Sequence, residues 1–344
     1  MAGVYPPVFD GHNDTVLSIA RVGRSFFERG TADTDVFAGG AGGHLDLPRA
    51  RDGNFAGGFF AVYVPDPPDG TRPMSLAYAQ SQALSALGTL VKVEAESDGD
   101  VVVVTTAAEI EGALSNGKLA MLLHLEGAEP IDAEGRALEV YYAAGVRSVG
   151  LTHSRDNIFG YGVHGQFPSS PDTGPGLTEA GQELVRLCNR LGVVIDLSHL
   201  NEKGFWDVAR LSEDPLVATH SNAHALTPHP RNLTVEQLDA VRDSNGIVGL
   251  NFAVSFLRDD GARDADTPVS RMVDHIEYLA DTVGIDRVAL GSDYDGTIVP
   301  RDIGDAAGLP VLFDALRARG YDDAALEKIA WRNWVRVLRD TWGE

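Results

Sequence analysis

The sequence predicts one α/β domain, a single (β/α)₈ TIM-type barrel with long βα loops over the C-terminal face. Three observations favour this fold. Eight short runs of apolar and β-branched residues recur along the 344 residues, helix-like stretches separate them, and polar residues stand at the last positions of the runs. Alternating strands and helices indicate a parallel sheet, and eight such units fit a closed barrel better than an open sheet. We therefore expect residues 1–344 to form one domain.

The expected strands are short and bounded by turn residues. They cover 8–14, 59–64, 119–127, 146–153, 193–199, 216–221, 246–252 and 287–296. The run VVVVT, within 97–110, is expected to add one strand outside these eight.

The stretches between the strands have the spacing of apolar residues that is typical of helices. We expect helices within 75–96, 138–145, 176–192, 202–211, 234–246 and 269–284. Two connections, 24–50 and 154–176, are too long for plain turns and are predicted to pass above the barrel.

Polar residues end the strands more often than apolar strands require. The first strand ends in FDGHND, where His12 and Asp14 stand two positions apart and project from one face of an extended chain, a face whose parity Asp10 shares. Because the C-terminal strand ends of a barrel converge on one mouth, these residues are predicted to meet there. The others are Glu126, His153, His199, His220, Asn251 and Asp293.

Convergent imidazoles and carboxylates are the ligands of zinc and similar divalent ions. Three histidines with Asp14 and Glu126 exceed what one catalytic zinc needs if it is to keep a position open for water. Two metal ions fit better, with a carboxylate such as Glu126 shared between them.

Composition excludes several classes of function. The formal net charge of −22 argues against nucleic-acid and anionic-membrane partners, which are bound through clusters of Lys and Arg. Cys188 is the only cysteine, so a disulfide scaffold is excluded, and a buried, inert thiol is expected. No apolar run approaches 18 residues, and MAGVYPPVFDG lacks the features of a secretory signal. A cytoplasmic location is the expectation.

Taken together, the sequence resembles the membrane dipeptidase (renal dipeptidase) family, the M19 metallopeptidases of the amidohydrolase-type barrels. The resemblance covers nearly the whole chain. It rests on the blocks FDGHND, LHLEGAEPI, VGLTHSRDN, VVIDLSHLN, ATHSNAHALTPHPRNLT, LNF and LGSDYDG.

The resemblance implies zinc-dependent hydrolysis of dipeptides, L-Xaa-L-Xaa and also L-Xaa-D-Xaa, by a hydroxide that bridges two Zn²⁺ ions. It implies that His12, Asp14 and Glu126 hold one ion, and that Glu126, His199 and His220 hold the other. A homodimer is compatible with the sequence.

The resemblance also assigns roles around the metals. His153, in GLTHS, resembles the residue that stabilises charge on the scissile carbonyl, and Arg231, in PRNLT, the one that receives the substrate carboxylate. Asp293, in GSDYDG, resembles the acid that passes a proton to the leaving amine. Separately, Tyr63, at the end of the second strand, is a candidate to bind the substrate's amino group.

Two positions depart from the family pattern. Glu129 stands where mammalian relatives have a histidine, and Phe256 stands where an aromatic hydroxyl is expected. These differences leave the metal ligands in place and put the preferred side chains of the substrate in question.

The other histidines have simpler interpretations. His44 is expected near a helix start, His164 on the loop above the barrel, and His275 on an exposed helix face. His224 and His229 are expected to shape the loop of Arg231. His124 faces the barrel interior, either supporting the metal ligands or as a core residue.

Two alternative functions remain open. One keeps the barrel and the metals but catalyses another reaction, as a lactonase, phosphotriesterase or deaminase. The other is a binding protein without catalytic activity on the same fold. Arg231 discriminates against the first, because only a substrate with a free carboxylate needs it.

Overall fold

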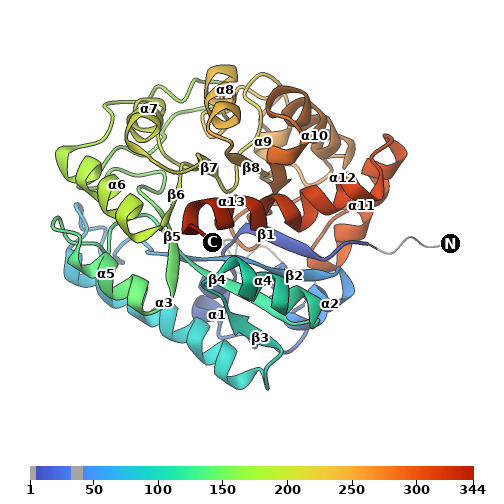
Figure 1. The fold of residues 1–344 in the computed structure, drawn as a ribbon, viewed down its shortest axis with the longest axis horizontal. Coiled ribbons are helices and arrows are strands. Elements are labelled where there is room, and N and C mark those ends of the chain that lie inside the picture. The colour runs from blue at the N-terminus through green and yellow to red at the C-terminus, as the bar shows by residue number, and fades with distance from the viewer. Residues whose placement is uncertain (1–4, 32–41) are drawn as a thin grey trace.

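The predicted barrel is confirmed by a computed structural model, which describes residues 5–31 and 42–344. Eight parallel strands follow one another around a nearly closed ring in the order β1-β2-β4-β5-β6-β7-β8-β9, with helices outside them (Figure 1). A parallel bridge between Asn13 and Tyr294 joins the two ends of the ring. There the backbone N–H of Asp293 donates to the carbonyl of His12 at 2.9 Å.

All eight predicted strands are present, most of them shorter than expected. β3 is the predicted additional strand, and it pairs only with β4, outside the ring. The strands are β1 (Val8–Asn13), β2 (Phe55–Tyr63), β3 (Val101–Val103), β4 (Leu119–Glu126), β5 (Val146–Gly150), β6 (Val194–Asp196), β7 (Val217–Ala218), β8 (Ile247–Leu250) and β9 (Val288–Leu290).

The six predicted helices are also present, as α3, α5, α6, α7, α8 and α10, and others join them. The α-helices are α1 (Thr15–Val22), α2 (Leu47–Asp52), α3 (Leu76–Glu96), α4 (Ala107–Ser115), α5 (Arg136–Ala143), α6 (Glu179–Leu191), α7 (Glu202–Leu211), α8 (Val235–Asp243), α9 (Val254–Leu257), α10 (Ser270–Val283), α11 (Leu309–Ala318), α12 (Asp323–Glu327) and α13 (Asn333–Trp342). Short 3₁₀ turns cover Ile285–Arg287 and Ala306–Gly308, and a π turn covers Lys328–Arg332.

Of the two long connections, one is described in full and the other in part. Residues 154–176 follow β5 without forming a helix or strand, as predicted for a loop above the barrel. Of the segment 24–50, residues 32–41 lie outside the described part, and α2 begins within its last residues. Among the described helices, none is both long and apolar enough to cross a membrane.

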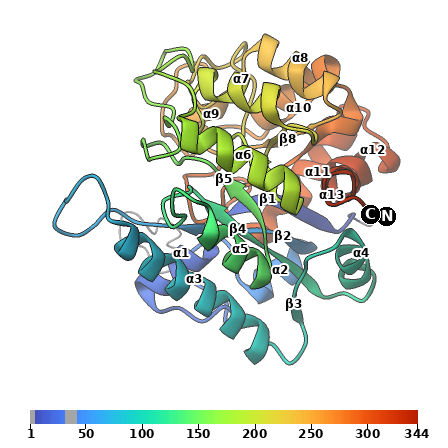
Figure 2. The same ribbon diagram turned by 60° about the vertical axis from the view of Figure 1, so that its left-hand side comes forward.

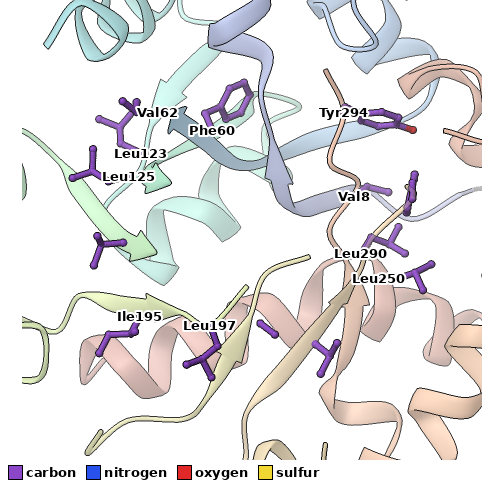
Figure 3. Close-up of a cluster of buried hydrophobic side chains, with 14 of the residues drawn as sticks. Val8, Phe60, Val62, Leu123, Leu125, Ile195, Leu197, Leu250, Leu290 and Tyr294 are labelled. Atoms are coloured by element: carbon purple, nitrogen blue, oxygen red, sulfur yellow. The ribbon is translucent and has the colours of Figure 1, made fainter. Parts of the chain in front are cut away.

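Alternation along the strands builds two apolar layers. On β4, Ala120 and Leu122 belong to the cluster inside the barrel, whereas Leu123 and Leu125 belong to the larger cluster between strands and helices. Figure 3 shows residues of the outer layer, including Phe60, pointing outward from the ring of strands. The inward parity continues on β4 to His124 and Glu126, so the same alternation that builds the core aims polar side chains into the upper barrel.

Helix α13 closes the end of the barrel opposite to these polar residues. Its Trp334 is fully buried, donates from Nε1 to the carbonyl of Leu290 at 3.0 Å, and lies 5.0 Å from the ring of Phe59. A Cβ atom at Gly11 would stand 2.4 Å from the Trp334 ring, so only glycine leaves room for it. Figure 2 shows α13 on the side away from the loop that leads into α3.

Candidate metal centre and active site

Seven polar side chains meet at the C-terminal end of the barrel, where active sites of this fold are built. Each one stands at or just after the end of a strand, so the parallel sheet brings together residues that are far apart in the sequence. They are His12 on β1, Asp14 at the start of α1, Glu126 at the end of β4, His153 after β5, His199 after β6, His220 after β7 and Asp293 after β9.

One oxygen of Glu126 lies at the centre of this group. Glu126 Oε1 is 3.5 Å from His12 Nε2, 3.1 Å from His199 Nε2 and 3.8 Å from His220 Nε2. Asp14 Oδ2 lies 3.5 Å from His12 Nε2 on one side, and on the other the Nε2 atoms of His199 and His220 lie 3.0 Å apart. The donors thus form two sets that share Glu126.

The first strand is less regular than its sequence suggests. The pairing of β1 with β2 shifts register between Asp10 and Asn13, and Asp14 lies at the N-terminus of α1 rather than in the strand. Asp10 shares the parity of His12 but is not among the seven side chains of the site. Its carboxylate accepts instead from the backbone N–H and the hydroxyl of Ser292, both at 2.7 Å.

Hydroxyl groups orient two of the imidazoles. The Thr219 hydroxyl donates to Asp196 Oδ2 at 2.6 Å, so its oxygen accepts from His220 Nδ1 at 2.7 Å. Ser154 Oγ lies 2.7 Å from His199 Nδ1. With Nδ1 engaged in this way, Nε2 of each ring faces Glu126.

These supporting hydroxyl groups were not predicted from the sequence. Thr219 directly precedes His220, and Ser154 directly follows His153, so a hydroxyl beside a candidate histidine was the available signal.

Two residues of the site have a strained backbone. His199 and Asp293 adopt the left-handed conformation, with φ of 69° and 60°. For residues other than glycine this conformation costs about 1–3 kcal/mol each and persists only where the surrounding structure imposes it. In both cases the turn ends a strand and directs the side chain into the site.

Burial and crowding perturb the charges of these groups. Burial and the neighbouring Asp14 raise the pKa of Glu126 well above its ordinary value, and the same two causes raise the pKa of Asp293 to about 6. Burial opposes the charge of His12, but Glu126 and Asp14 outweigh it and raise its pKa to about 10. Burial lowers the pKa of His199 and of His220 well below the ordinary value.

These residues fit divalent metal ions. Both ring nitrogens of His12 are buried and have no hydrogen-bond partner among the described residues, which is costly unless something binds them. Burial keeps the imidazoles of His199 and His220 neutral, as metal ligands must be. Buried carboxylates that lie close together repel one another, and bound dications would neutralise this repulsion.

Arg231 stands beside this centre. It is 6% exposed, donates from Nη2 to the carbonyl of His220 at 3.2 Å, and its Nε has no hydrogen-bond partner in the described structure. Its guanidinium carbon lies 5.6 Å from the ring centre of Phe256. Most of its donors therefore remain available to a ligand.

His153, Tyr63 and Asp293 complete the surroundings. The ring of His153 lies 4.2 Å from that of His199 and 4.7 Å from that of Tyr63. Burial, together with Arg155 and Arg231, lowers the pKa of His153 to about 3, so that this imidazole is neutral near pH 7. Asn251 donates from Nδ2 to Asp293 Oδ2 at 2.9 Å.

The histidines outside the centre take the places expected for them, with one exception. His44 lies just before α2, His164 Nε2 contacts Asp156 at 2.8 Å on the loop, and His229 Nδ1 accepts from the backbone N–H of Arg231. The prediction for His275 was wrong. Its side chain is buried in the structure beside Ala223 and Thr227, because α10 turns this face toward the loop after β7.

Known proteins are similar to this chain in sequence and in fold. Residues 4–342 match the family model described as "Membrane dipeptidase (Peptidase family M19)". A solved structure described as a dipeptidase AC, a metallopeptidase of family M19, is 48% identical with a TM-score of 0.91, covering 99% of this chain and 100% of that one.

Two further relatives extend the comparison. A metallopeptidase from Rhodobacter sphaeroides, solved with a phosphinate mimic of the dipeptide L-Ala-D-Ala, is 46% identical with a TM-score of 0.91, covering 98% of this chain and all of that one. Dipeptidase ataJ from Aspergillus terreus is 31% identical over 97% of this chain and 84% of its own length.

Proposed function

This chain is a dipeptidase of the membrane dipeptidase family, peptidase family M19, and on that premise we propose that it hydrolyses L-Xaa-L-Xaa and L-Xaa-D-Xaa dipeptides with two Zn²⁺ ions. We propose that the whole chain acts as one domain. The observation that carries the proposal is the position of Glu126 Oε1, within 4.0 Å of the Nε2 atoms of four histidines.

In this proposal the two donor sets hold the two ions. His12, Asp14 and Glu126 would hold one, and Glu126, His199 and His220 the other. When bound, such ions polarise the scissile carbonyl and lower the pKa of water, which supplies a nucleophile near neutral pH.

The remaining residues bind the substrate and move its proton. Arg231 would receive the free carboxylate of the dipeptide, because a guanidinium fork matches a carboxylate. His153, neutral because of its lowered pKa, would donate to the carbonyl oxygen as negative charge develops on it. Asp293, oriented by Asn251, would accept a proton from the attacking water and deliver it to the departing amine.

A substrate screen tests this function. The protein is stripped of metal, reloaded with Zn²⁺ and assayed with L-Ala-L-Ala and L-Ala-D-Ala, with L-Ala-L-Ala amide as the control that lacks a free carboxylate. We expect both dipeptides to be cleaved and the amide to be a poor substrate. A chain that holds two zinc ions and cleaves no free dipeptide would refute the proposal, and cleavage of the L-L dipeptide alone would refute its D-residue part.

A further inference from the structure

Arg155 joins three strand ends on one side of the active site. It follows β5, and its Nη2 donates to the carbonyl of Val64 at 2.6 Å, just after β2. Its Nη1 donates to the hydroxyl of Tyr63 at 3.0 Å, and its guanidinium lies over the Tyr63 ring at 4.9 Å. Its Nε donates to Glu129 Oε1 at 2.7 Å, in the loop after β4.

Glu129 holds this guanidinium in place. Its side chain is only 6% exposed, and its Oε2 is buried with no hydrogen-bond partner among the residues that the structure describes. A buried carboxylate with one oxygen left unpaired is costly, and the positive charge of Arg155, 2.7 Å from the other oxygen, compensates for it. Removing Arg155 would leave Glu129 buried without its counter-charge. Removing Glu129 would leave Arg155 with its bonds to Val64, Tyr63 and Asp66, the last at 3.3 Å, but without its buried counter-charge.

Tyr63 carries the effect of this pair into the active site. Its ring contacts His153, with 4.7 Å between ring centres, and a cavity of about 1080 Å³ opens beside both. Glu129 and Arg155 also line this cavity, whereas Arg231 does not. That volume slightly exceeds the usual range for small-molecule sites, so there is room for a bulky side chain.

The direction of a bound dipeptide assigns this cavity to one end of the substrate. With the C-terminal carboxylate on Arg231 and the peptide carbonyl at His153, the N-terminal residue continues past His153 to the cavity side. This step rests on the proposed function.

We propose that the Glu129–Arg155 pair fixes Tyr63 as a wall of the pocket for the side chain of the substrate's N-terminal residue. The pair thereby determines selectivity at the N-terminal position of the dipeptide and not at the C-terminal one. Glu129 acts through Arg155 and is a positioning residue.

The residues that line the cavity also predict which charge on the substrate side chain is disfavoured. Five carboxylates line the cavity against two guanidinium groups, so an anionic N-terminal side chain is disfavoured. The carboxylates belong to Asp66, Glu129, Asp132, Glu134 and Asp156, and the guanidinium groups to Arg72 and Arg155.

Two substrate pairs and matched variants test the proposal. L-Leu-L-Ala and L-Ala-L-Leu move the bulk from the N-terminal to the C-terminal residue, and L-Gln-L-Ala and L-Glu-L-Ala differ in charge at nearly equal size. The variants are Arg155→Met, Glu129→Gln and Tyr63→Phe, which retains the ring and removes the hydroxyl. Arg147→Met is the control, because Arg147 also lies over a tyrosine ring, that of Tyr142 at 4.0 Å, but outside the cavity.

We expect Arg155→Met to lower kcat/KM for L-Leu-L-Ala about tenfold relative to L-Ala-L-Leu, chiefly through KM, because a displaced pocket wall costs about that much. Tyr63→Phe should shift this ratio in the same direction, and Arg147→Met should leave it unchanged. For the two substrates that differ in charge, Arg155→Met and Glu129→Gln should shift the preference in opposite directions. Arg155→Met should widen the preference for L-Gln-L-Ala over L-Glu-L-Ala, and Glu129→Gln should narrow it.

General loss of folded protein cannot imitate these results, because it lowers the activity toward every substrate by the same factor. If Arg155→Met does not fold, the ratios of kcat/KM between paired substrates in Glu129→Gln and Tyr63→Phe test the proposal instead. Unchanged ratios in active variants would overturn this inference alone. A zinc-loaded wild-type protein that cleaves no dipeptide would overturn the proposed function and this inference with it.

Discussion

Replacing Arg231 with alanine should weaken the binding of dipeptides far more than it slows their cleavage. The Arg231 guanidinium has five N–H donors, and among the described residues it makes one hydrogen bond, to the carbonyl of His220 at 3.2 Å. Its Nε is buried without a hydrogen-bond partner in the described residues. The side chain is thus desolvated in advance for a ligand.

The magnitude follows from the bonds that a carboxylate would make. Two charge-assisted hydrogen bonds contribute about 1.5–3 kcal/mol each. The loss of these bonds in Arg231→Ala is partly offset because the variant no longer buries an unpaired donor. The net loss of binding free energy is about 3 kcal/mol, which corresponds to an increase of about a hundredfold in KM. Arg231→Lys retains the positive charge but not the forked guanidinium, so its KM should lie between those of the wild type and Arg231→Ala.

The assay compares two substrates with two enzymes. KM and kcat are measured for L-Ala-L-Ala and for its amide with the wild type and with Arg231→Ala. If Arg231 binds the carboxylate, the wild type discriminates strongly between the substrates and the variant hardly does, so that the two losses are not additive. An unchanged KM for L-Ala-L-Ala, or an equal loss for both substrates, would refute the assignment and favour another metal-dependent hydrolase.

Three further predictions concern metal binding, acid stability and thiol reactivity. Thr219→Val removes the acceptor that orients His220 and should lower Zn²⁺ affinity about 10- to 100-fold, measured by competition with a chelator, and an unchanged affinity would contradict this role. Burial would raise the pKa of Asp295, but hydrogen bonds from His44 and the charge of Arg24 outweigh it and lower the pKa. Because its pKa is lower in the folded state than in the unfolded state, Asp295 stabilises the protein above about pH 4, and this stability is lost as the pH falls. In Asp295→Asn, the free energy of unfolding should therefore fall less steeply as the pH is lowered below about 4. Burial raises the pKa of the Cys188 thiol to about 12, so a thiol reagent should label it at pH 8 only after unfolding, and rapid labelling of the native protein would show that the side chain is accessible.

The fold could be predicted because its signals are local and repeated. Each strand carries its own apolar run and each helix its own spacing, and the closed ring follows from their number and order. The sequence could not place α13 inside the end of the barrel. That position depends on the fit of Trp334 against Gly11 and Phe59, which are more than 270 residues away along the chain.

The gathering of the candidate metal ligands at one end of the barrel was predictable for a similar reason, since strand ends converge in any such barrel. Side-chain direction was less predictable. His275 was misplaced because α10 packs more of its surface than its spacing suggested, and the parity of Asp10 did not reveal that its carboxylate contacts Ser292. The partners of Arg155 and Thr219 come from other strands, so a single sequence does not pair them.

The position of Trp334 also bears on the order in which a newly made chain can fold. Helix α13 covers the last ten residues before Gly343, so the ribosome has released nearly every strand before the tryptophan emerges. Until then Phe9, Phe59 and Leu122 have no cover at the lower end of the barrel. Transiently uncovered apolar surface of this kind promotes aggregation during synthesis. The interval between the synthesis of β9 and that of α13 is therefore the one in which this apolar surface lies uncovered.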